Sequence, residues 1–310
     1  MAKSIFDRIG AQADNAVAGL TAARMDYLVR RVAAKGDPEG NGNLVEIPKA
    51  FGLWTSKGTF LANAVGDEYR VVQHAEQMQV MDALVAQGKA KLRTVGSLSE
   101  RTAFAWADLP IITEVRPGDP VQWGLLMTSS HGATANHAFL MAERPACKNV
   151  MPRLYKGGVL GLKVTLRHSG DVQQKLHRVS QMLEAALNQV NVEHDMWRQL
   201  AGKKISKADA LALVRQWTGA EEAAKLGDRD KVAKLEMQAE HVCKLADTSP
   251  GSKGDSSLWE LLNGMTFFLD HAQARYARSI AAAKRFAAST LDGVQGKKRD
   301  LALAMVQAKL

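Results

Sequence analysis

Polar side chains gather between two strand-like stretches near the middle of the chain. The run Thr128–His137 carries hydroxyl, imidazole and amide groups, and Arg144, Cys147 and Asn149 come a few residues later. The packing of a core does not require so many polar groups between two apolar runs. We therefore expect a polar ligand to contact the protein here.

The same region is basic. Six lysine and arginine residues lie between residues 144 and 168, beside one acid, Glu143. Cations interleaved with neutral donors bind phosphate backbones without reading bases. Strand alternation places Lys163, Thr165 and Arg167 on one face, which we expect to form a groove wall. The expected nucleic-acid-binding residues are His131 and Asn149 as hydrogen-bond donors, with Lys148, Arg153, Lys156, Lys163, Arg167 and His168.

The positive charge is concentrated in the second half of the chain. Residues 1–150 hold sixteen Lys/Arg against fifteen Asp/Glu, whereas residues 151–310 hold twenty-five against seventeen. A localised basic excess is typical of proteins that bind polyanions, although a solvated basic surface produces the same counts. A second basic surface, for a polyanion or another subunit, is expected at Arg275, Arg278, Arg285, Lys297 and Lys298.

The sequence lacks the motifs of nucleotide hydrolysis and of metal catalysis, and we expect neither an enzyme nor a cofactor. One alternative is an enzyme that uses His131, His137 and Cys147, with His168 as a further metal ligand. Cys147 and Cys243 are too few and too far apart for a redox or zinc framework, so we expect mostly structural thiols. Another alternative is a protein that binds a host factor instead of DNA.

The periodicity predicts an α+β fold with an antiparallel sheet, an embedded helix and a helical C-terminal half. The expected segments are an N-terminal helix and loop at 1–43, a core domain at 44–169 and a helical region at 170–310. No signal peptide or membrane span is recognisable, so a cytoplasmic location without membrane contact is expected.

Individual elements are predicted from apolar spacing, capping residues and turn residues. Expected strands are Leu44–Ile47, Leu92–Leu98, Thr102–Ala107, Val121–Thr128, Asn136–Ala142 and Val159–His168. Expected helices are Asn15–Ala34, Val71–Gln87, Asp171 to just before Gly202, Ser206–Trp217, Asp230–Ala246, a long helix from Leu258, and Arg299–Lys309 after breaks at Gly293 and Gly296.

Several short motifs resemble one known family, the phage and plasmid-borne domain of unknown function numbered nine hundred and thirty-two. They extend over most of the chain from about Asn63. The motifs are Tyr69-Arg70-Val71-Val72-Gln73, Val95-Gly96-Ser97-Leu98, Ser130-His131-Gly132, Arg144-x-x-Cys147-x-Asn149, Arg167-His168, Leu258-Trp259-x-Leu261-Leu262-Asn263 with Thr266, Asp270 and His271, and Gly296-Lys297-Lys298 with Leu301 and Ala302.

This resemblance implies an origin in a mobile element. The order of elements also resembles phage single-strand annealing recombinases of the RecT, Redβ and Rad type. That second resemblance implies a ring or filament of identical subunits holding single-stranded DNA in a basic groove, without ATP. The sequence therefore leads us to expect an annealing protein for homologous recombination, whose partners are single-stranded DNA, further copies of itself and a host single-strand-binding protein.

Overall fold

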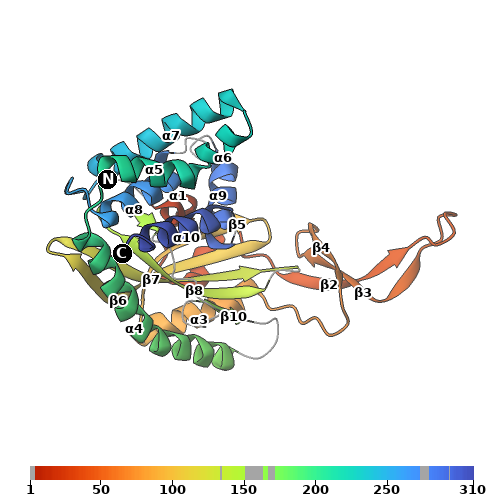
Figure 1. The fold of residues 1–310 in the computed structure, drawn as a ribbon. Helices are drawn as coiled ribbons and strands as arrows, with labels where there is room; N and C mark the ends of the chain where they lie inside the picture. Colours follow the sequence, from red (N-terminus) through yellow and green to blue (C-terminus); the bar gives the residue numbers. More distant parts are fainter. Residues whose placement is uncertain (1–3, 133–134, 151–162, 167–171, 273–278, 293) are drawn as a thin grey trace.

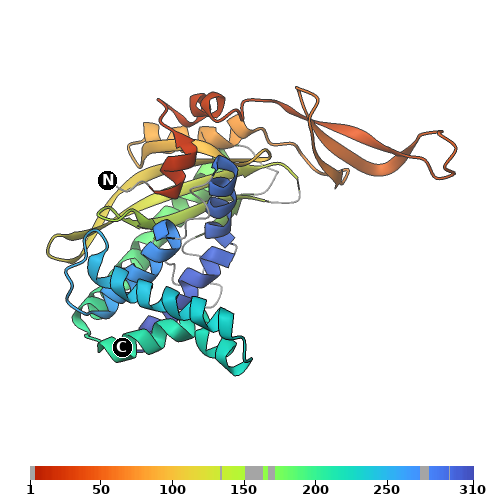
Figure 2. The ribbon, with the colours of Figure 1, turned by 90° about the horizontal axis from the view of Figure 1, so that it is seen from above.

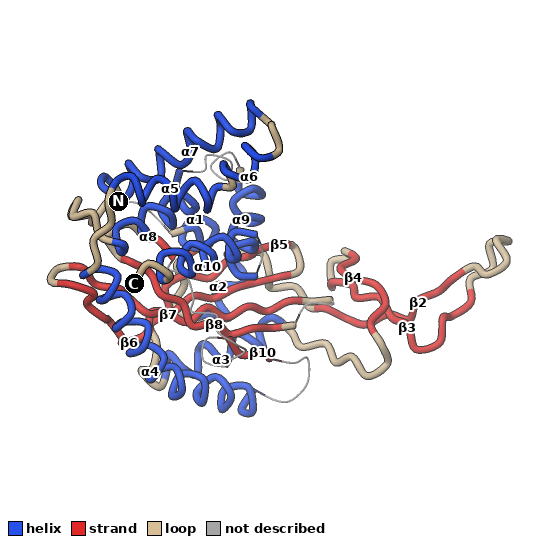
Figure 3. Tube along the Cα trace, viewed as in Figure 1, coloured by secondary structure: helices blue, strands red, loops and turns tan. Residues whose placement is uncertain are grey.

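An antiparallel sheet from the N-terminal half packs against helices that come mostly from the C-terminal half, which confirms the expected α+β class (Figures 1 and 3). The computed structural model describes residues 4–132, 135–150, 163–166, 172–272, 279–292 and 294–310. Within them, no helix is both long enough and apolar enough to cross a bilayer.

The main sheet is an antiparallel meander of long strands. Its strand order is β1-β5-β6-β7-β8-β10, and β9 pairs with β8 beside this path. Alternate residues of each strand face opposite layers, as Ala105 and Trp106 of β6 do. The strands are β1 (Gly10–Ala11), β5 (Lys91–Ser99), β6 (Thr102–Arg116), β7 (Asp119–Ser130), β8 (Asn136–Arg144), β9 (Asn149–Val150) and β10 (Lys163–Leu166).

Helices cover both faces of this sheet. Those packed on the Ala105 face are α2 (Ala16–Ala22), α3 (His74–Ala86) and α4 (Val172–Gly202), and those on the Trp106 face are α1 (Ile5–Ile9) and α9 (Ile280–Asp292). The other helices are α5 (Lys207–Thr218), α6 (Ala220–Lys225), α7 (Arg229–Thr248), α8 (Leu258–Phe267), the π-helix η1 (Phe268–Ala272) and α10 (Val294–Gln307). The core cluster on the Ala105 face includes residues of both halves of the chain, so the halves fold around a shared interior.

A second sheet extends away from this body as an arm (Figures 1 and 2). The arm consists of β2 (Val29–Gly36), β3 (Val45–Thr55) and β4 (Phe60–Val65), paired antiparallel. Its base is fixed by the Gln73 side chain, which accepts a hydrogen bond from Val29 N at 2.9 Å and donates one to Val29 O at 2.8 Å.

Most of the expected elements are present. Four expected strands match β5, β6, β7 and β8; they are Leu92–Leu98, Thr102–Ala107, Val121–Thr128 and Asn136–Ala142. Four expected helices match α3, α4, α5 and α7; they are Val71–Gln87, Asp171–Gly202, Ser206–Trp217 and Asp230–Ala246. The expected strand Val159–His168 is confirmed only at Lys163–Leu166, because its other residues lie outside the described part. Gly296 lies inside α10, so a helix break at that residue was wrong.

The helix expected near the N-terminus was wrong, because part of its range forms a strand. A helix over Asn15–Ala34 was expected, but α2 ends at Ala22 and Val29–Gly36 forms β2. β2 pairs with β3, so the loop between them is a hairpin turn and the boundary expected at residue 43 falls inside the arm. Pairing with the next strand along the chain here overrides local helix preference.

A buried ionic cluster, which we call the junction cluster, joins the sheet to the helical half. Asp119 accepts hydrogen bonds from Arg144 Nε at 2.6 Å, Arg144 Nη2 at 2.8 Å and Trp259 Nε1 at 2.8 Å. Arg116 pairs with Asp255 at 2.6 Å and also with Glu260 of α8. These charges are paired inside the protein, where removing one partner is costly.

Candidate nucleic-acid interface

The polar run at the β7–β8 connection is an internal network and not an open site. Ser129, Ser130, His131 and Asn136 are all buried. Ser129 Oγ lies 2.8 Å from Nδ1 of His74 on α3, and Asn136 Oδ1 accepts a hydrogen bond from Ser130 N at 2.7 Å. The Ser129 hydroxyl and the Asn136 carbonyl oxygen are thus satisfied within the fold, as buried polar groups usually are.

His131 lies at the centre of this network. Its ring packs against His74, with centroids 4.2 Å apart, and near the ring of Tyr27 at 6.4 Å. Only 1% of its surface is exposed. A phosphate cannot reach the ring in this conformation, so we leave His131 out of the interface.

Lys148 and Asn149 also have structural partners. Lys148 adopts a left-handed backbone with φ of 59°, and its Nζ lies 3.0 Å from Glu143 Oε1. The Asn149 side chain is fully buried and donates to Asn263 O and Thr266 Oγ1 of α8, both at 3.2 Å. Asn149 therefore connects β9 to α8 and is also excluded from the interface, while the positive charge of Lys148 is paired with a carboxylate.

Glu143 forms a second ion pair within the body. Arg93 donates to both of its carboxylate oxygens, at 3.0 Å each, and also pairs with Asp7. Burial raises the pKa of Glu143 and outweighs the nearby cations Arg93 and Lys148, which lower it. Several basic side chains of the body are therefore already neutralised.

Lys163 is the expected residue that lies at an open surface. It lines a groove of about 670 Å³ between β10 and α4, together with Thr165, Arg178 and Gln181. Arg178 is exposed and forms no ion pair within the described residues. The expected residues Arg153, Lys156, Arg167 and His168 lie outside the described part of the chain.

Lys163 and Thr165 also contact β8, on the Trp106 face of the sheet, opposite the face that α4 covers. The Lys163 ammonium lies 5.3 Å from the ring centroid of Phe139, within the range of a cation–π contact. Thr165 Oγ1 lies 3.4 Å from His137 Nδ1, and the His137 ring lies 5.5 Å from that of Phe139. The edge of the sheet thus presents one cation together with neutral hydrogen-bonding groups.

The second basic surface is described only in part. Arg285 is exposed on α9, and Lys297 and Lys298 are exposed on α10, which packs against α9. Arg275 and Arg278 lie outside the described residues. Of the two helices, α9 packs on the face of the sheet opposite α4.

The arrangement of the cysteine and histidine candidates does not resemble a catalytic centre. Burial raises the pKa of the Cys147 thiol to about 12, so it is protonated at neutral pH. His131 packs against His74 and His137 packs against Phe139, each apart from Cys147. Among the described residues, no group of three or more His, Cys, Asp or Glu side chains could hold a metal ion.

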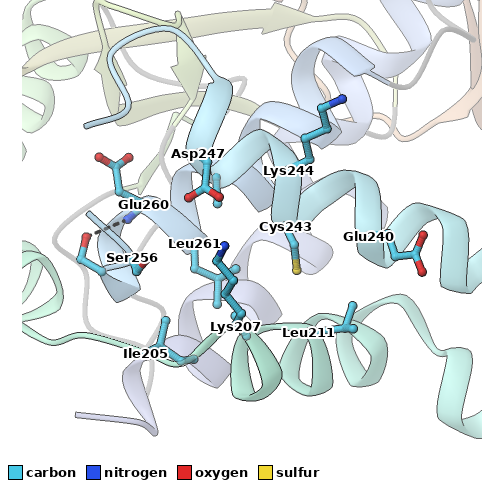
Figure 4. A pocket seen from close by; sticks show the side chains of 13 residues that line it. Ile205, Lys207, Leu211, Glu240, Cys243, Lys244, Asp247, Ser256, Glu260 and Leu261 are labelled. Carbon is cyan, nitrogen blue, oxygen red and sulfur yellow. Dashed lines mark hydrogen bonds between the residues drawn. The ribbon is translucent and has the colours of Figure 1, made fainter. Parts of the chain in front are cut away.

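A separate pocket of about 290 Å³ lies between α5, α7 and α8 (Figure 4). Its wall includes Lys207 and Lys244 but also Glu240 and Asp247. Burial, together with the weaker effects of the Asp247 and Glu240 charges, raises the pKa of the Cys243 thiol in this wall. Because the wall carries both signs of charge, it lacks the cationic excess of the groove.

Sequence reasoning missed two groove residues, Arg178 and Gln181. Both are exposed on α4, three positions apart and therefore on one face. The available signal was the polar face of this long amphipathic helix, which begins shortly after the basic strand. What the sequence could not provide was the packing of α4 against β10.

The fold and the groove define an α+β protein whose sheet edge and neighbouring helix form a cationic surface cleft. The chain belongs to the family described as Domain of unknown function (DUF932), whose model matches residues 62–291. The match begins in β4, so β2 and β3 precede it. No curated protein and no solved structure matches the chain.

Proposed function

We propose that the protein binds single-stranded DNA along the groove between β10 and α4. The observation that carries this proposal is that Lys163 and Arg178, from two different elements, both line one open groove. Thr165 and Gln181 add neutral hydrogen-bonding groups beside the two cations. Cations and neutral donors together bind phosphate oxygens without recognising the base sequence.

The size of the groove favours a single strand over a duplex. A volume of about 670 Å³ is in the range of clefts that enclose a small organic molecule. A few nucleotides of a single strand fit such a space, whereas a duplex is too wide to enter it. Phosphates would contact Lys163 and Arg178, and each contact would release a counterion.

The proposal extends to the annealing of complementary strands without ATP by an assembly of identical subunits in the cytoplasm. It is supported by the resemblance to single-strand annealing recombinases and by the lack of nucleotide-hydrolysis motifs in the sequence. A ring or filament and a host single-strand-binding protein remain the expected partners. No catalytic role is proposed.

A titration of fluorescein-labelled oligo(dT) by fluorescence anisotropy at several salt concentrations tests the groove. The double variant Lys163→Ala/Arg178→Ala should bind more weakly, and its salt slope should fall by about 1.4, because each single-strand phosphate contact contributes about 0.7. The matched control is Lys225→Ala/Lys231→Ala, which removes two exposed cations from α6 and α7.

The proposal is overturned if the wild-type protein shows no salt-dependent affinity for oligo(dT). It is also overturned if the groove variant and the control variant lose the same amount of affinity. Electron microscopy with and without the oligonucleotide then tests whether bound subunits assemble into rings or filaments.

A further inference from the structure

The arm carries a row of exposed side chains across its three strands. In the strand register, Arg30 of β2 lies opposite Trp54 of β3, and Trp54 lies opposite Phe60 of β4. Residues directly opposite in an antiparallel sheet point to the same face. Arg30, Trp54 and Phe60 therefore form one row, which we call the stacking platform.

The two aromatic rings of the platform are in contact and open to solvent. Their centroids are 5.2 Å apart with an interplanar angle of 58°. Trp54 is 36% exposed and Phe60 is 46% exposed. Gly52 leaves room for them, since a Cβ there would lie 3.2 Å from both Phe60 Cε2 and Trp54 Nε1.

The exposure of Trp54 is specific to the arm. All six tryptophans lie in the described part of the chain, and the other five are buried. The opposite face of the arm has its own small core around Leu53 and Leu61, so the sheet does not need Trp54 for packing. Together with Phe60, Trp54 forms a contiguous exposed apolar patch, and such patches mark contact sites.

We infer that the stacking platform binds unpaired bases of a single-stranded nucleic acid. The π-face of any base stacks on an exposed aromatic side chain, and a neighbouring cation contacts the adjacent phosphate. Arg30 provides that cation directly beside Trp54. Residues 29–65 carry five basic side chains against three acidic ones, a balance that favours a polyanionic partner over a basic one.

This inference shares only the class of ligand with the proposed function. The groove between β10 and α4 binds phosphates, whereas the platform binds bases from a different sheet. Variants of the two sites should therefore change two different measurements. Loss of the groove lowers the salt slope, and loss of the platform lowers the preference for DNA with bases over DNA without them.

Trp54 fluorescence provides a direct measurement. Because the other tryptophans are buried, acrylamide should quench Trp54 selectively in the free protein. Addition of oligo(dT) should quench the same emission and protect it from acrylamide. An abasic oligonucleotide of equal length should produce neither change, because it offers phosphates without bases.

Affinity measurements on variants complete the test. Trp54→Ala should weaken oligo(dT) binding by about 5-fold to about 150-fold, the range for one stacked base, and leave binding of the abasic oligonucleotide unchanged. Trp54→Phe keeps an aromatic face and should retain most of the affinity. Ile47→Ala, which shortens another exposed apolar side chain of β3, is the matched control.

Two results would overturn the inference. One is equal loss of affinity for oligo(dT) and for the abasic oligonucleotide in Trp54→Ala. The other is unchanged DNA affinity together with dissociation of an assembly, seen by analytical ultracentrifugation, which would make the platform a contact between subunits. Neither result tests the groove, which is tested by the salt dependence of oligo(dT) binding.

Discussion

The junction cluster and the groove use the same residue types for opposite purposes. In the junction cluster, Arg144 is fully buried and is held by Asp119 in two hydrogen bonds. In the groove, Arg178 is exposed on α4 and lines the same open surface as Lys163. An arginine count therefore overstates the charge that the protein can offer to a polyanion.

Because of this contrast, the junction cluster should affect folding stability and the groove should affect binding. A buried pair contributes to stability only while both partners remain, whereas an exposed cation contributes almost nothing to folding. Substitutions in the two regions should accordingly produce separable effects. Unfolding and binding measurements on variants of each region can confirm or break that separation.

Arg144→Ala should cause the largest loss of stability. The variant leaves Asp119 buried without its main partner, and breaking a buried pair costs about 3–5 kcal/mol. Urea unfolding followed by circular dichroism measures the change. Lys225→Ala, which removes an exposed cation, should stay within about 0.5 kcal/mol of wild type. A loss below about 1 kcal/mol in Arg144→Ala would contradict the structural role given to the junction cluster, by the same scale.

Ser129→Ala should have an intermediate effect. It removes the hydroxyl that lies 2.8 Å from His74 Nδ1, and loss of a buried hydrogen-bond partner costs about 1–3 kcal/mol. The same unfolding measurement applies, with the exposed Thr21→Ala of α2 as the control. Equal stability of the two variants would mean that the polar network does not stabilise the β7–β8 connection.

Alkaline pH should weaken the fold through Cys147. Burial raises the pKa of this thiol from 9.0 to about 12, so the folded state holds its proton longer than the unfolded state does. The stabilisation is complete below a pH of about 9 and is lost as the pH rises toward 12, by at most about 1.4 kcal/mol per pH unit. Unfolding measured from about pH 8 to about pH 11 should show a shallower decline in Cys147→Ala.

Tyr27 accounts for part of the remaining alkaline decline, because burial raises the pKa of its phenol to about 12 as well. The difference between wild type and Cys147→Ala isolates the thiol, since both proteins retain Tyr27. Identical pH profiles would show that Cys147 does not titrate differently in the two states. A thiol reagent offers an independent check, since Cys147 in a Cys243→Ala background should react only after unfolding.

Lys163→Ala/Arg178→Ala should have the smallest effect on stability. Neither cation is fully buried, and surface substitutions of this kind change the free energy of unfolding by about 0.5 kcal/mol or less. The same variant should lose salt-dependent DNA affinity. A large loss of stability would mean that the groove is a packing feature and would remove the distinction between the two regions.

The sequence predicted the body of the fold better than the arm because the body obeys local periodicity. The buried positions of α3 recur at three- and four-residue steps, and β6 and β7 are largely buried apolar runs, so the signal for each element lies within it. The arm does not, since Val29–Gly36 becomes a strand only through pairing with Val45–Thr55. Its hairpin loop is rich in glycine, which is equally typical of a linker.

Candidate residues were harder to predict than elements. His131 and Asn149 were singled out for their chemistry, but they are buried against distant residues of α3 and α8. Lys163 was identified because strand alternation places it at a surface, and it does line an open groove. Burial depends on long-range packing, which a polar run alone does not specify.

The π-helix η1 follows α8 directly and has a wider turn than an α-helix. Its wider turn holds Asp270 where one carboxylate oxygen accepts from Val150 N at 2.9 Å and the other meets Arg299 of α10. Deleting one residue from Phe268–Ala272 would restore α-helical winding and rotate the next part of the chain by about 100°. Through Asp270, this turn links β9 to α10 at the end of α8.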